Sequence, residues 1–325
     1  MIELRGRNIL VTGGTGFIGS SLIRDLIARG ARVRCFDDNS RGAQAKLSNA
    51  VAQVEIVTGD IRDAAAVRLA ARGMDSVCHL AYINGTEFFY EKPDVVLEVA
   101  VKGMMNVLDA CLSERIRDLI VASSSEVYQN AARIPTPEDV PLVVPDVTNP
   151  RYSYGGGKII SELLTFNYGR KHFDRAVIFR PHNVYGPAMG SEHVIPQFTL
   201  RMIQAGRDGR QAVPFPIQGT GQETRAFIYI DDFTDGLIRV LECGEHLNVY
   251  NIGTSDEVTV AHVARLVARC LDREIDVIPG AILQGSSARR CPDITKLQAL
   301  GFAPKTALED GIAATVAWYR SYCSV

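Results

Sequence analysis

The sequence predicts an α/β fold with a doubly wound parallel sheet, and three observations lead to that prediction. Short apolar runs alternate with helix-like stretches from the start of the chain. The first run leads directly into a glycine-rich turn and then into a helix, and serines close a later run. Because strands that alternate with helices pair in parallel, helices should cover both faces of a single sheet.

Each predicted strand is a short apolar run, and each predicted helix is a longer stretch with apolar residues at helical spacing. Gly30 suits the end of the first helix, since glycine accepts the left-handed backbone found there. The predicted strands cover residues 9–11, 32–36, 54–57, 76–80, 119–122 and 176–179. The predicted helices cover residues 18–28, 94–114, 153–171, 231–242, 259–272 and 307–322.

Prolines and glycines become frequent after Arg180, which predicts loops and a change of architecture. We therefore expect a first domain over residues 1–180, which a segment near 226–252 rejoins. Residues 181–325 should mainly build a smaller, discontinuous α/β lobe.

Composition narrows the choice of partners and compartment. Lys and Arg total 35 and Asp and Glu total 37, so no basic excess exists to neutralise a nucleic-acid backbone. No apolar run approaches the roughly 18 residues that span a bilayer, and no leader-like segment precedes the first strand. The seven cysteines are odd in number and form no CxxC pair, which indicates free thiols in a reducing compartment. We expect a soluble, cytoplasmic protein with no membrane partner and no metal site.

Gly13, Gly16 and Gly19 are spaced three residues apart in the turn over residues 12–19. The first suits a tight turn, the second lets the backbone approach a pyrophosphate, and the third lets the helix pack close to the sheet. The helix N-terminus then offers free N–H groups and a partial positive charge. Glycines alone are weak evidence, because many turns need them, but this strand–turn–helix context favours a dinucleotide site.

An acidic residue closes the second predicted strand, since Asp37 lies 24 residues after Gly13. A carboxylate there can accept hydrogen bonds from both ribose hydroxyls and would repel a 2′-phosphate, so it favours NAD over NADP. The alternative is an ordinary solvent-facing turn over residues 37–40. The glycine turn and Asp37 together favour the dinucleotide.

Two further stretches could carry chemistry. Ser124 follows the predicted strand at 119–122, at the sheet edge where parallel sheets bind ligands. Tyr154 and Lys158 are four residues apart on a predicted helix and share a face. A lysine ammonium beside a phenol should lower the pKa of the phenol, so that Tyr154 can take a proton from a substrate hydroxyl. Taken alone, the serines could form a plain polar loop, and such a Tyr–Lys pair is common by chance.

Nine motifs follow one another in an order found in a known family: TGGTGFIGS at 12–20, Asp37, GDI at 59–61, HLA at 79–81, SSSEVY at 123–128, YGGGK at 154–158, RPHNVYGP at 180–187, TRAFIYIDD at 224–232 and RCPDI at 290–294. With these motifs the sequence resembles the extended short-chain dehydrogenases/reductases, in particular the NAD-dependent nucleotide-sugar epimerase/dehydratase branch, nearly end to end. The resemblance implies a Rossmann-like NAD-binding domain, a substrate-binding C-terminal lobe and a nucleotide-diphosphate sugar as substrate.

The resemblance also implies roles for individual residues. Ser124, Tyr154 and Lys158 would form a catalytic triad, in which Tyr154 takes the proton of the sugar C4 hydroxyl while hydride passes to NAD⁺. The implied cofactor-binding residues are Gly13, Gly16, Phe17, Ile18, Gly19, Asp37, Asn39, Asp60, Ile61, Leu80, Ala81, Tyr154 and Lys158. The implied substrate-binding residues are Ser125, Asn183, His193, Val194, Arg225 and Arg290.

Four positions depart from the family pattern. Tyr82 replaces a small residue after His-Leu-Ala, and Gln129 replaces a glycine after Val-Tyr. Ala100 and His193 stand where many members carry an asparagine. The triad is intact, so these departures bear on the identity of the nucleotide and the sugar.

Three outcomes are open for the C4 ketose. Reduction from the other face gives a 4-epimer, loss of water across C5 and C6 gives a 4-keto-6-deoxy sugar, and a uronic acid can lose CO₂. Glu126 is the discriminating candidate, because elimination needs an acid and a base whereas epimerisation needs neither there. The dehydratases resembled carry Asp-Glu where this chain has Ser125-Glu126. We expect a 4-epimerase first, then a 4,6-dehydratase, then a uronate decarboxylase, and only remotely a non-catalytic NAD-binding protein.

The predicted helices at 94–114 and 153–171 are more apolar than one sheet face requires. In the family these helices pair across a two-fold axis as a four-helix bundle, so we expect a homodimer. Deep packing on the sheet alone is the alternative. The apolar residues concerned include Met104, Met105, Leu108, Leu163, Leu164 and Phe166.

Overall fold

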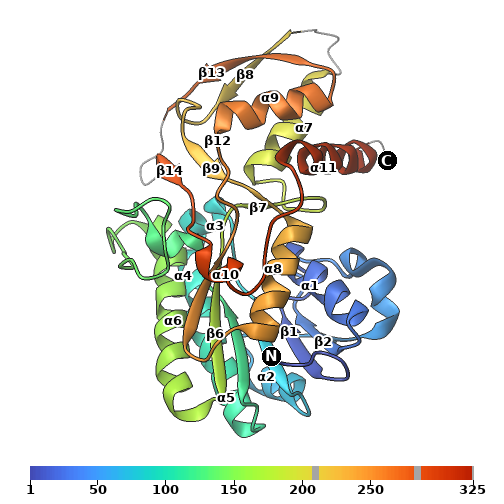
Figure 1. Ribbon diagram of the computed structural model, residues 1–325, viewed down its shortest axis with the longest axis vertical. Coiled ribbons are helices and arrows are strands. Elements are labelled where there is room, and N and C mark those ends of the chain that lie inside the picture. The colour runs from blue at the N-terminus through green and yellow to red at the C-terminus, as the bar shows by residue number, and fades with distance from the viewer. Residues whose placement is uncertain (207–211, 282–286, 324–325) are drawn as a thin grey trace.

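The computed structural model describes residues 1–206, 212–281 and 287–323, and its main feature is a seven-stranded parallel sheet (Figure 1). The strand order is β11-β6-β5-β4-β1-β2-β3, so the winding reverses between β1 and β4, as in Rossmann folds. The predicted doubly wound sheet is confirmed. The strands are β1 (Asn8–Thr12), β2 (Arg32–Asp37), β3 (Val54–Thr58), β4 (Ser76–His79), β5 (Asp118–Ala122), β6 (Arg175–Pro181) and β11 (Asn248–Ile252).

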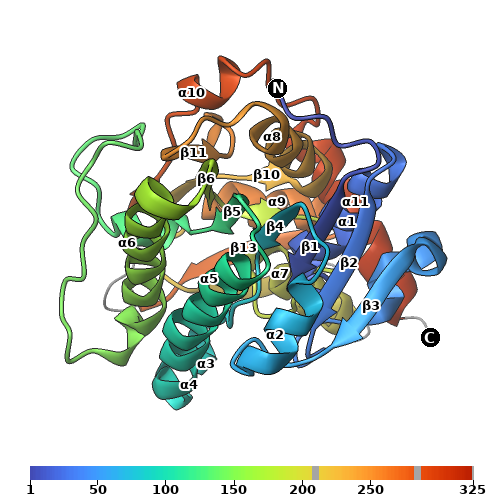
Figure 2. The ribbon, with the colours of Figure 1, turned by 90° about the horizontal axis from the view of Figure 1, so that it is seen from below.

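Helices cover both faces of this sheet, as Figure 2 shows. One face carries α1 (Phe17–Ala28) and α8 (Ile230–Cys243), which pack against each other. The other face carries α2 (Ala64–Ala71), α5 (Met104–Ser113) and α6 (Ser153–His172). Gly30 follows α1 with φ +83°, as its predicted place at the helix end requires.

The helix predicted over residues 94–114 is interrupted by a wider turn. α4 (Pro93–Leu97) leads into a π-helical segment, η2 (Glu98–Gly103), and α5 follows directly. Such segments recur at functional sites. η2 packs against α6, which carries the predicted Tyr–Lys pair.

A smaller lobe occupies the upper part of Figure 1, and the chain returns from it through α8 before β11 joins the sheet beside β6. Its own apolar core includes Phe198, Phe215, Val267 and Ile312. The lobe contains α7 (Val194–Gly206), the paired β8 (Ala212–Ile217) and β13 (Glu274–Pro279), the sheet of β12 (Glu257–Thr259), β9 (Thr224–Ala226) and β14 (Arg289–Arg290), and the helices α9 (Val260–Cys270) and α11 (Leu308–Cys323). The short elements of the chain are η1 (Gln44–Gln53), α3 (Thr86–Glu91), η3 (Ser125–Tyr128), η4 (Pro150–Tyr152), β7 (Val184–Tyr185), β10 (Ile228–Tyr229) and α10 (Thr295–Gln298).

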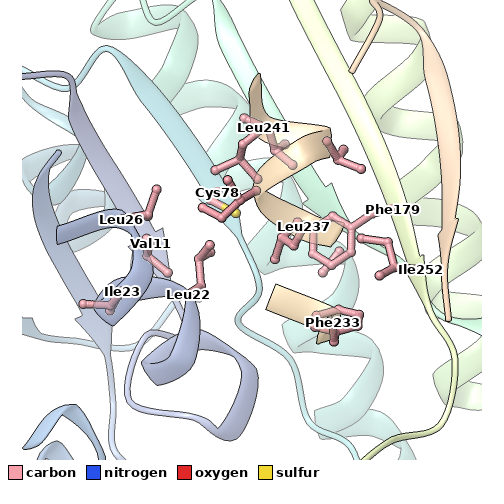
Figure 3. Close-up of a cluster of buried hydrophobic side chains, with 14 of the residues drawn as sticks. Val11, Leu22, Ile23, Leu26, Cys78, Phe179, Phe233, Leu237, Leu241 and Ile252 are labelled. Carbon is pink, nitrogen blue, oxygen red and sulfur yellow. The ribbon is translucent and has the colours of Figure 1, made fainter. Parts of the chain in front are cut away.

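The largest apolar core lies between the sheet and the helices α1 and α8 (Figure 3). Val11 of β1 and Cys78 of β4 face Leu22 of α1 and Leu237 of α8, and all four side chains are fully buried. Burying an aliphatic side chain of this size contributes about 1.5–3 kcal/mol. This core holds α1 close to the strand that precedes it, which fixes the glycine turn between them.

Four of the cysteines are buried thiols: Cys35, Cys78, Cys111 and Cys291. Burial raises the pKa of Cys35 to about 12, so this thiol is chemically inert at neutral pH.

Among the residues that the structure describes, no helix is both long and apolar enough to cross a membrane.

Candidate active site

A cleft of about 580 Å³ opens at the carboxyl ends of the sheet strands, where the two lobes meet. The strand ends supply Gly13, Asp37 and Leu80, and the smaller lobe supplies His193 and Arg290. Doubly wound sheets bind their ligands at this edge, next to the point where the strand order reverses. The cleft is therefore the candidate active site.

The glycine turn forms one wall of the cleft and fits a pyrophosphate. Gly13 has φ +72°, and a Cβ there would lie 2.7 Å from the backbone nitrogen of Ala81. A Cβ on Gly19 would collide with the carbonyl oxygen of Gly13. None of the described side chains caps α1, and its first turn carries no acidic residue. Its first N–H groups can therefore bind a phosphate. Phe17 and Ile18 line the cleft beside Gly16.

Asp37 is held rigidly at the end of β2. Its Oδ2 accepts the Thr15 N–H at 3.0 Å, and its Oδ1 accepts the Asn39 N–H at 2.8 Å. Each carboxylate oxygen keeps a further lone pair, so both ribose hydroxyls can still be bound. The side-chain oxygens of Thr15 and Asn39 are buried without a partner among the described residues. Orphaned polar atoms at this place fit a site that a dinucleotide completes.

Asp60, Ile61, Leu80 and Ala81 line the same cleft, as predicted for cofactor contacts. Arg62 donates to the Asp60 carboxylate from Nε at 3.0 Å and from Nη2 at 2.6 Å, and this hydrogen bonding lowers the pKa of Asp60. Asp60 is therefore an ionised, anchored group in the cleft lining.

Ser124, Tyr154 and Lys158 converge on the cleft from two elements. Ser124 caps η3, with its Oγ accepting the Glu126 N–H at 3.2 Å. Tyr154 and Lys158 are buried one turn apart near the start of α6. Ser124 lowers the pKa of the Tyr154 hydroxyl, and Lys158 Nζ donates to the Ala122 carbonyl at 2.7 Å. The fold thus brings the three predicted triad residues to one place.

The expectation that Lys158 lowers the pKa of Tyr154 is wrong for this structure. Burial raises the pKa of Tyr154 to about 12, and the hydrogen bond with Ser124 only partly offsets this. Lys158 Nζ lies 5.9 Å from the centroid of the Tyr154 ring but 3.6 Å from that of Tyr82. Burial also lowers the pKa of Lys158 to about 7, against the opposing charge of Glu162. The physical reason is that both groups are desolvated and the Tyr82 ring stands beside the ammonium.

Glu126 lies between Arg290 and Arg151 in the cleft lining. Its Oε1 accepts a hydrogen bond from Arg290 Nη1 at 2.6 Å, and its Oε2 lies 3.8 Å from Arg151 Nη2. Burial alone would raise the pKa of Glu126, but the charges of Arg290 and Arg151 outweigh burial and lower it. Glu126 is therefore ionised at neutral pH and carries no proton to donate.

The structure places the other predicted substrate residues in different ways. Ser125, Asn183 and His193 line the cleft with Arg290, and burial lowers the pKa of His193 to about 4, which keeps it neutral. Val194 begins α7 and does not line the cleft. Arg225 also lies outside the cleft lining, because it donates to the carbonyls of Thr224 and Ser287, each at 2.7 Å.

The cleft residues that were not predicted from the sequence include three charged ones, Arg41, Arg151 and Glu192. Arg151 stands three residues before Tyr154, and that spacing is the one signal that could have revealed it. Arg41 forms an ion pair with Glu192 of the smaller lobe and lies 4.9 Å from the ring centroid of Phe88. Nothing in the sequence joins positions 41 and 192, since only the tertiary fold brings them together.

A buried ion pair anchors α6 behind the triad. Glu162, one turn after Lys158, accepts from Arg180 Nε at 2.8 Å and Nη2 at 2.6 Å, and both side chains are under 5% exposed. Arg180 Nη1 also donates to the Tyr128 hydroxyl at 2.6 Å. Buried charges persist when they are paired in this way. The network ties η3 and α6, the two elements that carry the triad, to β6.

Comparisons with known proteins agree with this geometry. The chain matches the model of the NAD dependent epimerase/dehydratase family over residues 9–253. A UDP-N-acetyl-alpha-D-glucosaminuronate decarboxylase of Bacillus cytotoxicus is 28% identical, with 97% of this chain and 98% of the relative covered. The UDP-glucose 4-epimerase of Thermus thermophilus, solved with NAD, has a TM-score of 0.84 at 27% identity, covering 96% of this chain and 99% of its own. The dTDP-glucose 4,6-dehydratase of Streptomyces venezuelae, also solved with NAD, has a TM-score of 0.86 at 28% identity, covering 98% of both chains.

These three relatives carry three different named activities, so the likeness establishes the cofactor and the general chemistry but not the reaction. The matched stretch contains the glycine turn, Asp37 and the whole triad. This chain belongs to the NAD-dependent epimerase/dehydratase family and is an NAD-dependent enzyme of nucleotide-sugar chemistry.

Proposed function

We propose that this enzyme oxidises C4 of a nucleotide-linked hexose and that 4-epimerisation is the outcome. One observation carries the proposal. Ser124 and Tyr154 lie in one continuous cleft, whose lining includes the glycine turn and Asp37 as well as the arginines Arg151 and Arg290. A hexose between a dinucleotide and an arginine-bound diphosphate would place a ring hydroxyl beside Tyr154.

Each triad residue has a distinct task in this proposal. Tyr154 takes the proton of the C4 hydroxyl, and Ser124 orients that hydroxyl through its own hydrogen bond. One N–H of the Lys158 ammonium donates to the Ala122 carbonyl. The other two N–H groups can hold the nicotinamide ribose. NAD, when bound, accepts the hydride and supplies the positive charge of its ring beside the phenol.

The lack of an acid beside Glu126 argues against dehydration as the outcome. Elimination of water needs a base for the C5 proton and an acid that holds a proton, and because Arg290 and Arg151 keep Glu126 ionised, Glu126 could serve only as the base. The preceding residue is Ser125, so the chain has no second carboxyl group in this motif. Epimerisation needs only that the ketose turns in the cleft and takes back the hydride, with Tyr154 returning the proton. The missing carboxylic acid at position 125 therefore supports epimerisation over dehydration.

A second candidate, decarboxylation of a nucleotide-linked uronic acid, is favoured by Arg151. Arg151 and Arg290 both line the cleft and both approach Glu126, so two guanidinium groups flank the sugar end. A C6 carboxylate is the kind of group that such guanidinium pairs bind. Oxidation at C4 would turn that uronate into a β-keto acid, which can lose CO₂ without help from a carboxylic acid.

A product assay separates these outcomes. The purified enzyme is incubated with NAD⁺ and UDP-, dTDP-, GDP- and CDP-hexoses and UDP-uronates, and products are identified by mass spectrometry and NMR. An inverted C4 centre with unchanged mass supports epimerisation. A product lighter by CO₂ supports decarboxylation, and one lighter by water would contradict the argument from Glu126. Failure to oxidise any of these sugars would overturn the proposal as a whole.

We also propose a homodimer through the outer surfaces of α4 and α6. These helices pack against each other on one face of the sheet (Figure 2). Leu97 of α4 and Ile160 and Leu163 of α6 are exposed there. Two copies related by a two-fold axis could bury these side chains in a helical bundle.

A reducing compartment such as the cytoplasm fits the four buried free thiols.

A further inference from the structure

The side chain of Tyr82 occupies space that is free because Ala100 has a small side chain and Gly157 has none. A Cβ on Gly157 would collide with the Tyr82 hydroxyl and would lie 2.7 Å from the Cβ of Ala100. Tyr82 follows β4, Ala100 belongs to η2 and Gly157 to α6, so three elements meet at this hydroxyl. Glycine destabilises a helix interior relative to alanine, so its presence at 157 has a packing reason. By contrast, a Cβ on the adjacent Gly156 would meet only Val144, at 3.6 Å.

Tyr82 contacts both members of the Tyr–Lys pair. Its hydroxyl donates to the Tyr154 carbonyl at 3.3 Å, and its ring meets the Tyr154 ring edge-on with centroids 5.1 Å apart. Its face lies under Lys158 Nζ, which is 3.6 Å from the ring centroid. An aromatic face stabilises an ammonium over it, and more strongly where water is excluded. The small residues at 100 and 157 thus admit a ring that holds the lysine.

We propose that Tyr82 is a positioning residue that keeps the buried Lys158 charged and holds it in reach of the nicotinamide ribose. The ring acts through Lys158 rather than on the substrate. Removing the aromatic face should let burial discharge the lysine at a lower pH, and removing only the hydroxyl should not. The inference rests on the cofactor-holding role given to Lys158 under the proposed function, but its first test requires NAD binding alone.

The other groups around Lys158 do not replace the ring. Burial keeps His79 of β4 neutral, with a pKa of about 3, and it raises the pKa of both Tyr82 and Tyr154, so these phenols are neutral as well. Glu162, on the same helix, favours the ammonium but is already paired with Arg180. Around this site β5 contributes the Ala122 carbonyl, and η2 presents the uncharged Ala100.

The test follows NAD⁺ affinity with pH, by calorimetry, in the parent enzyme and two variants at position 82. If an ammonium holds the ribose, NAD⁺ binding weakens as pH rises through the pKa of Lys158. Tyr82→Leu removes the aromatic face and should lower that midpoint by about half a unit to one unit. Tyr82→Phe keeps the face and should leave the midpoint within about 0.3 unit of the parent.

A second pair of variants reaches the same contact from α6 and covers the case in which Tyr82→Leu does not fold. Gly157→Ser puts a side chain against the Tyr82 hydroxyl and should lower the midpoint in the same direction. Gly156→Ser is the matched control, because a Cβ there makes only an ordinary contact with Val144 at 3.6 Å, and its midpoint should equal that of the parent. Equal midpoints in all these proteins, or an NAD⁺ affinity that does not change with pH, would overturn the proposal.

Sugar turnover measured over the same pH range distinguishes this proposal from the proposed function. A shifted NAD⁺ midpoint without conversion of any nucleotide sugar would support the role of Tyr82 and count against the proposed reaction. Conversion of a sugar with an unshifted midpoint in Tyr82→Leu and Gly157→Ser would support the proposed reaction and count against the role of Tyr82.

Discussion

The Glu126 carboxylate accepts a 2.6 Å hydrogen bond from Arg290, and this contact joins η3 of the sheet domain to β14 of the smaller lobe. The pairing has two effects on the cleft. The positive charge of Arg290 keeps Glu126 ionised, and Glu126 in turn holds Arg290 in the cleft lining. Glu126 therefore anchors a cation at the cleft.

Glu126→Gln should therefore leave turnover within about tenfold of the parent, because a group that moves no proton does not contribute the roughly 10²-fold of a catalytic acid or base. KM should rise, since a neutral amide holds Arg290 less firmly. Steady-state kinetics with product analysis measures both, and Glu87→Gln on α3 is a surface control. A variant that forms NADH, stalls at the ketose and releases no product would show that Glu126 acts in an elimination.

Tyr154→Phe should lower turnover by about 10²-fold or more, because the ring remains while the proton acceptor is lost. The phenylalanine can still stack on Phe89, whose ring centroid lies 5.0 Å from that of Tyr154, so the site should keep its shape. NAD⁺ binding should persist at near-parental affinity. Tyr168→Phe, on the same helix, is the control for a lost hydroxyl. Near-normal turnover in Tyr154→Phe would remove Tyr154 from the mechanism.

The proposed dimer predicts that one leucine on α6 decides the oligomeric state. Leu163 is 58% exposed, and Leu163→Asp should produce a monomer because a charge in an apolar bundle is strongly disfavoured. Leu69→Asp on α2 is the matched control, since Leu69 is 63% exposed and lies outside the proposed interface. Light scattering at micromolar concentration should show dimers for the parent and for Leu69→Asp. A monomeric parent would refute the assembly.

The sequence predicted the sheet and the positions of the site residues along it, for a physical reason. Parallel strands bring their carboxyl ends to one edge, so Gly13, Asp37 and Ser124 had to lie near one another once the strands were recognised. The π-helical turn at η2 could not be predicted, because its apolar spacing is close to that of an ordinary helix.

Properties that depend on packing between distant segments could also not be predicted from the sequence. The pKa of Tyr154 follows from its burial beside Tyr82 and Phe89, and neither neighbour carries a sequence signal for that contact. The Arg41–Glu192 ion pair likewise exists only because the two lobes face each other. The motifs predicted many of the cleft residues but not the positions of Val194 and Arg225, which lie outside its lining, and the fold decides the charge of the buried groups.

Stability should fall in mild acid because of two buried histidines. Burial lowers the pKa of His79 and of His182 to about 3, whereas histidine in an unfolded chain titrates near pH 6.5. Between these values the unfolded chain binds a proton that the folded protein does not. The free energy of unfolding is therefore undiminished above about pH 6.5 and falls as the pH drops below it, by roughly 1.4 kcal/mol per pH unit for each histidine.

Urea unfolding at pH 7, 6 and 5 measures this slope, and two conservative variants assign it. His79→Asn keeps a polar atom near the position of Nδ1, which lies 2.8 Å from Thr12 Oγ1. His182→Gln keeps one near Nε2, which lies 3.0 Å from Asn251 Oδ1. Each variant removes one titrating imidazole, so each should flatten the loss of stability between pH 6.5 and pH 5 by about 2 kcal/mol. His262→Gln on α9 is the control and should leave the slope as it is. A slope unchanged in both His79→Asn and His182→Gln would mean that other groups cause the acid sensitivity.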